Sequence, residues 1–234
     1  MTRDQLAQAG FEVTEEAHAR LARFVEALLE TNRHINLTSL RVPEQVWAVH
    51  VCDALTLLPL IDESQARSLL DLGSGGGLPG LPIACVRPEL RVALLDATRK
   101  KLSAVGGICT GLGLGNVEFH WGRAERLAHD QALREEFDLV AARAVGALPL
   151  VLELASGFLR PHGYGLFYKS CQAVEGEVEA ARPAAHACAL VFEGVRTYSL
   201  PGEHGPRALA VYRKGARLRN SLPRASDQIA RRAL

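Results

Sequence analysis

The sequence has little of three features that mark specialised proteins: paired cysteines, long uncharged apolar runs and an excess of one charge. Its five cysteines lie far apart and form no CxxC pair, which argues against a disulfide framework or a zinc site and favours buried thiols in a reducing compartment. No signal peptide opens the chain, and no apolar run is long enough to span a bilayer. We therefore expect a cytoplasmic protein that binds neither a membrane nor a metal.

The charges nearly cancel, since the net charge is +1, so the chain carries no global signature of polyanion binding. Basic residues nevertheless gather towards the end, where residues 207–234 hold eight Arg or Lys and one acid, Asp227. Two interpretations of this stretch stay open. It contacts phosphates of a nucleic acid, or it is a solvated, disordered end.

The chain is long enough, at 234 residues with 48% hydrophobic residues, for one large α/β domain with an appendage. Helical spacing of apolar residues predicts a helix over 14–33, and a second helix is expected from Pro43 to about Leu58. We divide the chain into an N-terminal helical cap (1–65), a main domain (66–215) and a basic C-terminal tail (216–234).

Strand and helix patterns alternate through the main domain, which is typical of a parallel, doubly wound sheet. The predicted strands are 68–72, 91–95, 117–120, 137–141 and 163–169, and the predicted helices are 81–86, 98–112, 148–159 and 174–181. Two alternating runs follow, 190–200 and 208–213, joined by a glycine- and proline-rich turn. They predict an antiparallel hairpin at the edge of the sheet.

The most informative stretch is SLLDLGSGGGLPG at 68–80, a buried strand that runs into a cluster of glycines and then a helix. Glycine tolerates positive φ and lets a ligand approach the backbone, and the N–H groups at a helix start favour an anionic group. GxGxxG, the nicotinamide-dinucleotide pattern, can be traced through Gly75, Gly77 and Gly80. A plain strand–helix loop has the same composition, so the turn alone does not identify a ligand.

Charged residues at the ends of the other strands support a shared site, because ligands of such sheets bind at the carboxyl ends of the strands. Asp96 ends the second strand about 20 residues beyond the glycines, a spacing suited to a ribose. Glu125, Arg143 and Lys169 follow the next three strands. A dinucleotide or S-adenosylmethionine fits these residues. An acid two positions before the first glycine, Asp71, favours S-adenosylmethionine, whose ammonium group it would meet.

Several longer motifs are more specific than the glycine turn: NLTSL, HVCDAL, LLDLGSGGGLPGLPIA, LLDATRKKL, NVEFHWGRAE, FDLVAARAV and YGLFYKS. Through them, residues 32–214 resemble the RsmG (GidB) family of bacterial 16S rRNA guanine-N7 methyltransferases. Two positions depart from the family pattern. Ser170 stands where glycine is common, and VGGIC (105–109) stands where an aromatic–leucine pair is common.

The resemblance implies a class I S-adenosylmethionine-dependent methyltransferase fold, which is Rossmann-like, with a mainly parallel seven-stranded sheet, a C-terminal antiparallel hairpin and a helical cap. It implies methyl transfer to N7 of a guanine in the 530 loop of 16S rRNA, in the small ribosomal subunit. The residues expected to bind S-adenosylmethionine are Gly73, Gly75, Leu78, Asp96, Ala97, Thr98, Ala124, Glu125 and Arg143.

Guanine N7 carries a lone pair and no proton, so its methylation needs no general base. We expect Arg143 and Lys169 to position the reactants, and His50 and Asp53 to close the pocket from the cap. His50 and Asp53 are three residues apart, and a local pair on one helix face fits that spacing equally well. The residues expected to contact RNA are Arg123, Lys169, Arg207, Arg217 and Arg219.

Three other functions remain open at this point: a methyltransferase for a small molecule or a protein, an NAD-dependent dehydrogenase, and a non-catalytic RNA-binding assembly factor. The basic tail and the family motifs argue against the first of these. The glycine turn with Asp96 and Glu125 argues against loss of catalysis. We expect a monomeric enzyme.

Overall fold

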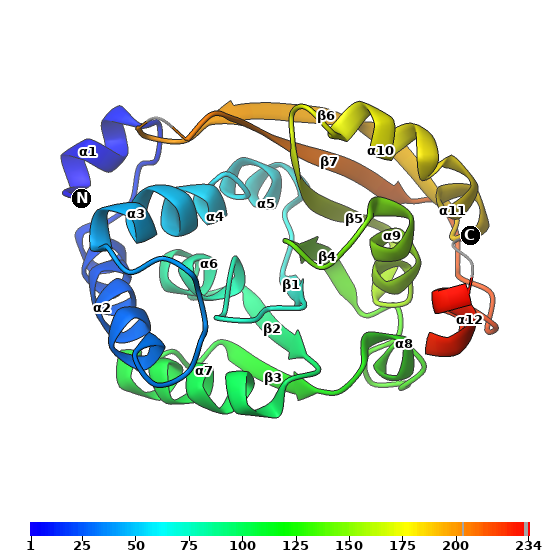
Figure 1. Cartoon of the computed structure of the whole chain (residues 1–234), viewed down its shortest axis with the longest axis horizontal. Coiled ribbons are helices and arrows are strands. Elements are labelled where there is room, and N and C mark those ends of the chain that lie inside the picture. Colours follow the sequence, from blue (N-terminus) through cyan, green and yellow to red (C-terminus); the bar gives the residue numbers. More distant parts are fainter. Residues whose placement is uncertain (203, 232–233) are drawn as a thin grey trace.

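Seven strands form one sheet in the order β3-β2-β1-β4-β5-β7-β6 in the computed structural model, which describes residues 1–202, 204–231 and 234 (Figure 1). The first five strands along the chain are parallel, whereas β7 runs antiparallel to both β5 and β6. The strands are β1 (Ser68–Leu72), β2 (Arg91–Asp96), β3 (Val117–Trp121), β4 (Phe137–Ala142), β5 (Leu159–Ser170), β6 (Leu190–Ser199) and β7 (Pro206–Lys214). The predicted α/β fold with a terminal antiparallel hairpin is confirmed.

Helices cover both faces of this sheet, as Figure 1 shows. Those of the main domain are α6 (Gly80–Val86), α7 (Arg99–Leu112), α8 (Ala124–Leu127), α9 (Leu148–Ser156), α10 (Val174–Ala180), α11 (Arg182–Ala187) and α12 (Ser226–Arg231). Those of the cap are α1 (Arg3–Gln8), α2 (Glu15–Asn32), α3 (Pro43–Val46), the π-helix η1 (Trp47–Cys52), α4 (Asp53–Leu55) and α5 (Leu58–Ser64). No described helix is long and apolar enough to cross a membrane.

The short helices α1, α5, α8, α11 and α12 were not predicted, and the predicted elements differ from the observed ones mainly in the cap helix and around β5. The helix expected from Pro43 to Leu58 is interrupted by η1, in which the backbone follows the wider π-helical turn. Strand β5 begins at Leu159 rather than at residue 163, because Leu159 pairs with Phe137 before a register shift. The preceding helix α9 correspondingly ends at Ser156.

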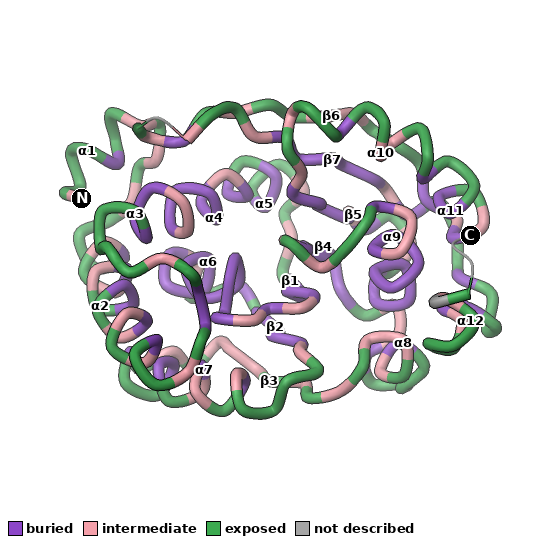
Figure 2. Tube along the Cα trace, viewed as in Figure 1, coloured by how far each residue is buried: buried purple, intermediate pink, exposed green. Residues whose placement is uncertain are grey.

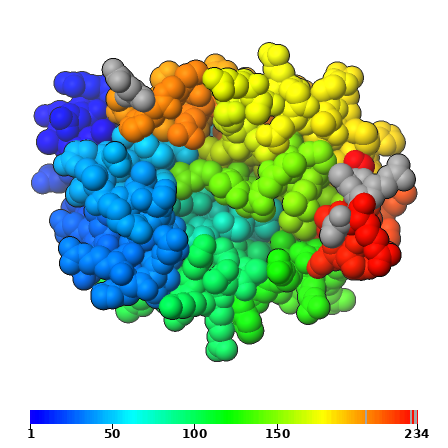
Figure 3. All heavy atoms as spheres, in the orientation of Figure 1, coloured from blue at the N-terminus to red at the C-terminus, as the bar shows by residue number. Residues whose placement is uncertain are grey.

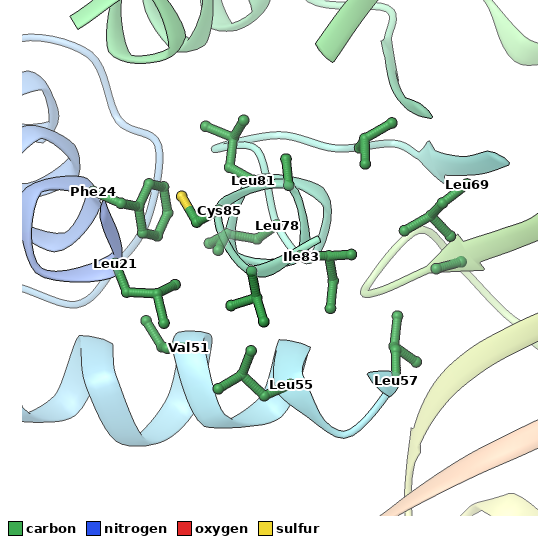
Figure 4. Packing of buried hydrophobic residues seen from close by; sticks show 14 of the residues in the cluster. Leu21, Phe24, Val51, Leu55, Leu57, Leu69, Leu78, Leu81, Ile83 and Cys85 are labelled. Atoms are coloured by element: carbon green, nitrogen blue, oxygen red, sulfur yellow. The ribbon is translucent and has the colours of Figure 1, made fainter. Parts of the chain in front are cut away.

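The cap is fused to the main domain through a buried apolar interface. Thr14 caps α2, since its Oγ1 accepts the Ala17 N–H at 3.2 Å. The buried face of α2, with Leu21 and Phe24, packs on α6 beside Cys85 (Figure 4). Burying one such large apolar side chain contributes about 1.5–3 kcal/mol. The expectation that the cap packs on the main domain is therefore confirmed.

Burial is deepest along the central strands, where the trace in Figure 2 is continuously purple. Every residue of β1 is buried. Leu69 faces the cluster shared with the cap, α6 and α7, whereas Leu70 and Leu72 face the cluster on the side of α9. Because a strand covered on both faces is held rigidly, the turn that follows β1 is firmly placed.

The segment after β7, predicted as a basic tail, packs on the main domain over its described residues. Arg224 forms an ion pair with buried Glu153 at 2.7 Å, and Arg134 donates to the carbonyls of Arg219 and Leu222 at 3.0 Å. Figure 1 shows α12 beside α8. The interpretation as a disordered end therefore does not hold for residues 216–231, while residues 232–233 of the predicted tail, Arg232 among them, lie outside the described part.

Candidate functional site

Two adjoining cavities open at the carboxyl ends of the central strands. The first has a volume of about 360 Å³, and Figure 3 shows the surface hollowed there, between the cap and the segments that follow β1 to β4. Its walls come from the glycine turn after β1, the turn after β2, the segment after β4 and the loop that follows α2. They comprise Leu37, Thr38, His50, Gly73, Ser74, Gly75, Gly76, Leu78, Asp96, Thr98, Lys101, Arg143, Ala144 and Val145.

Backbone hydrogen bonds within the turn and to the end of β2 hold the glycine turn in place. The Gly73 and Ser74 N–H groups donate to the Leu95 carbonyl at 2.8 and 3.0 Å, and the Gly77 N–H donates to the Ser74 carbonyl at 2.8 Å. Gly73 has φ +72°, and a Cβ there would lie 2.7 Å from Cγ2 of Val145. A side chain at Gly73 is therefore disfavoured by both backbone conformation and space.

Asp96 joins the two turns that form the floor of the first cavity. Its Oδ2 accepts the Gly75 N–H at 2.8 Å, and its Oδ1 accepts the Thr98 N–H at 2.7 Å. The side chain is only partly buried. A carboxylate has about four acceptor positions, so this one retains lone pairs for hydroxyl groups of a ligand. The predicted role of Asp96 in holding a ribose fits this arrangement.

Asp71 lies beneath the glycine turn and does not face the cavity. It is 0% exposed, and its Oδ2 accepts the Gly80 N–H at 2.7 Å, which fixes the start of α6. Burial raises the pKa of Asp71 to about 7, and its Oδ1 has no partner among the described residues. Contrary to the expected contact with an ammonium group, Asp71 supports the turn from within the core.

The second cavity is smaller, about 180 Å³, and shares Arg143 and Ala144 with the first. Its lining comes from the cap, from the ends of β4 and β5, and from the β6–β7 hairpin. The residues are Asp53, Arg143, Ala144, Tyr168, Lys169, Ser170, Tyr198 and Arg207. The two cavities therefore adjoin at Arg143 and Ala144.

A hydrogen-bond network around Arg143 organises this junction. Arg143 Nη1 donates to Asp53 Oδ2 at 2.9 Å and to the Val49 carbonyl at 3.2 Å. The other oxygen of Asp53, Oδ1, accepts the Tyr198 hydroxyl at 2.6 Å. Asp53 is only 3% exposed, so this carboxylate, hydrogen-bonded through both of its oxygens, fixes the direction of the guanidinium.

His50 is the second partner of Arg143, with Nη2 3.2 Å from Nδ1 of the imidazole. Burial, and then the charge of Arg143, lower the pKa of His50 to about 4. The ring is therefore neutral near pH 7, with Nδ1 accepting from Arg143 and Nε2–H donating to Thr38 Oγ1 at 2.6 Å. The local pair of His50 with Asp53 is not formed, because Arg143 bonds to each of them separately.

Lys169 lines the second cavity, but its ammonium group is already paired. Nζ lies 2.5 Å from Glu177 Oε2 and 2.9 Å from the Gly146 carbonyl, and Glu177 Oε2 also accepts the Leu148 N–H at 2.9 Å. These contacts hold the segment between β4 and α9, which carries Ala144. Lys169 thus supports the wall between the cavities.

Of the residues expected to bind S-adenosylmethionine, the structure gathers Gly73, Gly75, Leu78, Asp96, Thr98 and Arg143 around the first cavity. Ala97, Ala124 and Glu125 do not line it. Glu125, in the first turn of α8, is hydrogen-bonded to the Ser226 hydroxyl of the C-terminal segment. Arg123, Arg217 and Arg219 are exposed.

The sequence missed three residues of the junction. Thr38, Tyr168 and Tyr198 belong to the network or to the lining of the second cavity. Thr38 lies in NLTSL and Tyr168 in YGLFYKS, so both stand inside motifs that carried the resemblance. No motif in the sequence marked Tyr198 as a site residue, because its strand was predicted only as part of a hairpin at the edge of the sheet.

Comparison with known proteins shows the family to which the chain belongs. The model described as rRNA small subunit methyltransferase G matches residues 17–204. The chain belongs to this family. Its relatives include the ribosomal RNA small subunit methyltransferase G of Sorangium cellulosum, 45% identical over 179 residues that make up 76% of this chain and 74% of the relative. The protein of that name from Streptococcus sanguinis is 36% identical, with 98% of this chain and 96% of the relative covered.

Solved structures share the fold of this member of the family. The O-methyltransferase TomG from Streptomyces achromogenes, in complex with SAM, matches with a TM-score of 0.61 at 16% identity, covering 92% of this chain and 100% of that one. A putative O-methyltransferase from Klebsiella pneumoniae matches with a TM-score of 0.62 at 16% identity, covering 92% and 96%. The predicted family and the class I methyltransferase fold are confirmed.

Proposed function

We propose that this protein transfers the methyl group of S-adenosylmethionine to N7 of a guanine in the 530 loop of 16S rRNA. Membership of the family makes it an S-adenosylmethionine-dependent rRNA methyltransferase. The choice of guanine, of N7 and of the 530 loop is our proposal. Three features support it: the fit of the first cavity to the donor, the chemistry of the second cavity, and the cations around them.

The residues of the first cavity fit the donor. S-adenosylmethionine supplies an electrophilic methyl group on a sulfonium, together with an amino-acid head, a ribose and an adenine. We assign the free lone pairs of Asp96 to the ribose hydroxyls and the glycine turn, including Gly73, to the amino-acid head. Arg143 at the far wall is a cation for the carboxylate of that head or for the acceptor base.

One observation carries the choice of N7: no described side chain of the second cavity is a ready proton acceptor near neutral pH. Asp53 is buried and both of its oxygens are hydrogen-bonded. Burial raises the pKa of Tyr168 and of Tyr198 above its ordinary value, so both hydroxyls stay protonated. His50 at the junction is neutral but already bonded through both ring nitrogens. Such a cavity suits an acceptor that has a lone pair and no proton to lose.

Catalysis then depends on placement. Holding N7 in line with the methyl carbon and the sulfur can supply about 7–11 kcal/mol of the barrier. Arg207 lines the second cavity, is partly buried and has no ion-pair or hydrogen-bond partner among the described residues. We assign Arg207 to O6 of the guanine or to its phosphate, since a donor on N7 itself would block the reacting lone pair.

The remaining assignments follow from exposure and pairing. We assign Arg123 to the RNA backbone, because it is an exposed cation just after β3. Arg217 and Arg219 are also exposed, but they lie beside the amino end of β4, where Glu135 accepts the Leu218 N–H and Arg134 donates to the Arg219 carbonyl. We therefore assign to them only RNA that extends away from the cavities. Lys169 acts by supporting the wall between the cavities, because its ammonium is paired with Glu177. Our proposal includes a monomeric enzyme, acting in the cytoplasm on the small ribosomal subunit without a metal ion.

The test is transfer of labelled methyl from S-adenosylmethionine to small ribosomal subunits, followed by mapping of the modified base. We expect one label per subunit, on a guanine of the 530 loop, at a position that becomes sensitive to the reductive cleavage diagnostic of N7-methylguanine. Subunits treated with the Gly73→Val variant provide the blank, because a side chain at Gly73 collides with Val145. A label on another atom, or on large subunits only, contradicts the proposal.

A further inference from the structure

An exposed aromatic pair stands at the edge of the sheet beside the first cavity. Trp121 ends β3, the outermost strand, and is 58% exposed, and Phe119 is 39% exposed. Being two residues apart on one strand, both lie on the same face, that of α7. Gly106 of α7 lies next to Phe119 and has no side chain to cover it. A Cβ at Gly106 would lie in van der Waals contact with Phe119, 3.9 Å from Cζ.

Trp121 is exposed yet held in one orientation. Its indole Nε1–H donates to the Ala97 carbonyl at 3.1 Å, and the guanidinium of Arg99 lies 5.1 Å from the centre of its ring. Ala97 belongs to the turn between Asp96 and Thr98 that forms the floor of the first cavity. The ring does not itself line that cavity. A surface indole that is pre-oriented in this way loses little conformational freedom when a second ring stacks on it.

Cations outnumber acids around Trp121. Five cations lie on α7 and after β3 without a carboxylate partner among the described residues: Arg99, Lys100, Lys101, Arg123 and Arg126. The acids of this corner are engaged elsewhere. Asp96 accepts two backbone N–H groups, Glu118 pairs with Arg91, and Glu125 binds Ser226.

Several cations elsewhere on the molecule are paired with acids. Arg196 bonds to Glu63 at 2.7 Å, Arg213 to Glu193 at 2.8 Å and Arg87 to Asp62 at 2.8 Å. A corner that combines unpaired cations with a fixed aromatic ring matches the way proteins bind single-stranded nucleic acid, in which bases stack on rings and cations follow the phosphates.

We propose that Trp121 is a stacking platform for an unpaired base of the RNA substrate, with Arg99 and Arg123 binding the neighbouring phosphates. The inference rests on the proposed function and identifies a second RNA contact away from the reacting guanine. β3 lies four strands from β5, which is about 19 Å at the usual strand spacing. The stacked base is therefore a nucleotide several positions removed from the guanine in the second cavity.

The experiment compares wild-type protein with Trp121→Ala and Trp121→Phe in three measurements: KM for small subunits, the affinity for a single-stranded RNA about 12 nucleotides long, and the affinity for S-adenosylmethionine. Removing a stacking ring weakens nucleic-acid binding by about 5- to 150-fold. We expect a loss in this range for Trp121→Ala in both RNA measurements, near wild-type RNA binding for Trp121→Phe, and unchanged affinity for S-adenosylmethionine.

Fluorescence gives an independent readout in the unaltered protein. The other tryptophan, Trp47, is only 5% exposed. RNA should therefore quench wild-type emission, and this quenching should disappear in Trp121→Phe. The matched control is Phe192→Ala, which removes an exposed ring (43% exposed) from β6 at the opposite edge of the sheet and should leave RNA binding unchanged.

Three results would overturn the inference. Weaker binding of S-adenosylmethionine with unchanged RNA binding assigns Trp121 to the donor site. Loss of subunit binding without loss of binding to the RNA oligonucleotide assigns it to a ribosomal protein. Equal RNA binding by wild type and Trp121→Ala shows that Trp121 does not stack on a base of the RNA. In the last case wild-type methyl transfer to the 530 loop still stands, so the proposed function is tested separately.

Discussion

The two cavities that meet at Arg143 are built in different ways. Half of the residues that line the first come from two short stretches, the glycine turn and the turn after β2, which are joined by Asp96. The second is made of side chains from the cap, from β4 and β5, and from the hairpin. A general methyl donor is held by a contiguous motif, whereas the acceptor is selected by residues that only the fold brings together.

The two cavities also differ in how their buried groups affect the stability of the fold. The first cavity rests on a backbone turn that is hydrogen-bonded internally and to Leu95, with one buried acid, Asp71, beneath it. The junction instead buries an ion pair, Arg143 with Asp53, and a neutral histidine. Breaking a buried pair by removing one partner costs about 3–5 kcal/mol, because the other charge is left uncompensated. The acceptor side should therefore be the more fragile of the two.

The largest expected effect is that of Arg143→Ala, which removes the group shared by both cavities. We expect methyl transfer to fall by about 100-fold or more, as for other losses of alignment, together with a lower melting temperature because Asp53 loses its counter-charge. Steady-state kinetics with small subunits and thermal unfolding measure the two effects. Arg196→Ala, which breaks an exposed pair with Glu63, is the control and should change neither.

Substitution of Asp96 separates the first cavity from the second. Asp96→Ala should weaken binding of S-adenosylmethionine by about 10- to 150-fold, which corresponds to the 1.5–3 kcal/mol typical of hydrogen bonds to a charged group. Calorimetric titration gives the affinity, and KM for small subunits should stay near the wild-type value. Asp62→Ala provides a control, since it removes a surface carboxylate paired with Arg87. An unchanged donor affinity in Asp96→Ala would contradict the assignment.

Tyr198→Phe makes a smaller change, confined to the second cavity. It leaves Oδ1 of buried Asp53 without its partner, at a cost of about 1–3 kcal/mol in the free energy of unfolding. We expect transfer to fall several-fold while donor affinity stays unchanged. Tyr164→Phe is the matched control, because Tyr164 lies on β5 and lines neither cavity. Weaker donor binding in Tyr198→Phe would show that the two cavities are not separable in this way.

The smallest effect on methyl transfer is expected from the titration of His50 and Asp71. Their titration should nevertheless change the free energy of unfolding strongly. The pKa of His50 is lowered to about 4, so folding loses stability as pH falls from 6.5 towards 4, where the unfolded chain takes up a proton first. The pKa of Asp71 is raised to about 7, so folding loses stability as pH rises from 3.8 towards 7. The two groups therefore change stability in opposite senses as pH rises.

Two variants isolate these contributions. Relative to wild type, His50→Gln should flatten the rise in stability between pH 4 and 6.5, and Asp71→Asn should flatten the fall between pH 4 and 7. Each change amounts to about 3–4 kcal/mol over the full interval. Denaturant unfolding at a series of pH values measures it. Slopes that change in the same direction would contradict the opposed titrations, and wild-type transfer should stay nearly flat around neutral pH.

The sequence predicted the sheet well because its signals are local. Strand β1 was placed at its observed bounds, and the glycine turn and Asp96 fall where the structure has them. Periodicity and turn residues suffice for such elements. The break of the cap helix at η1 and the early start of β5 were missed, because each depends on contacts with distant parts of the chain, such as the pairing of Leu159 with Phe137.

For the site, too, single residues were predictable from the sequence, whereas their contacts with distant residues were not. Arg143, His50 and Asp53 were identified, but the pairing of both with Arg143 was not, since residues 90 positions or more apart meet there. Tyr198 was missed for that reason. Lys169 was predicted, from its place at a strand end, to position the reactants and to contact RNA, whereas Glu177, eight residues further on, neutralises it. A pattern of residue types does not reveal which charges are already paired.

The most direct test of this two-cavity arrangement is a crystal structure of the protein with S-adenosylmethionine. We expect the donor in the first cavity, with its ribose on Asp96 and its methyl group directed past Arg143 and Ala144 into the second cavity. A donor bound elsewhere, or one whose methyl group points into the core beneath the glycine turn, would contradict it.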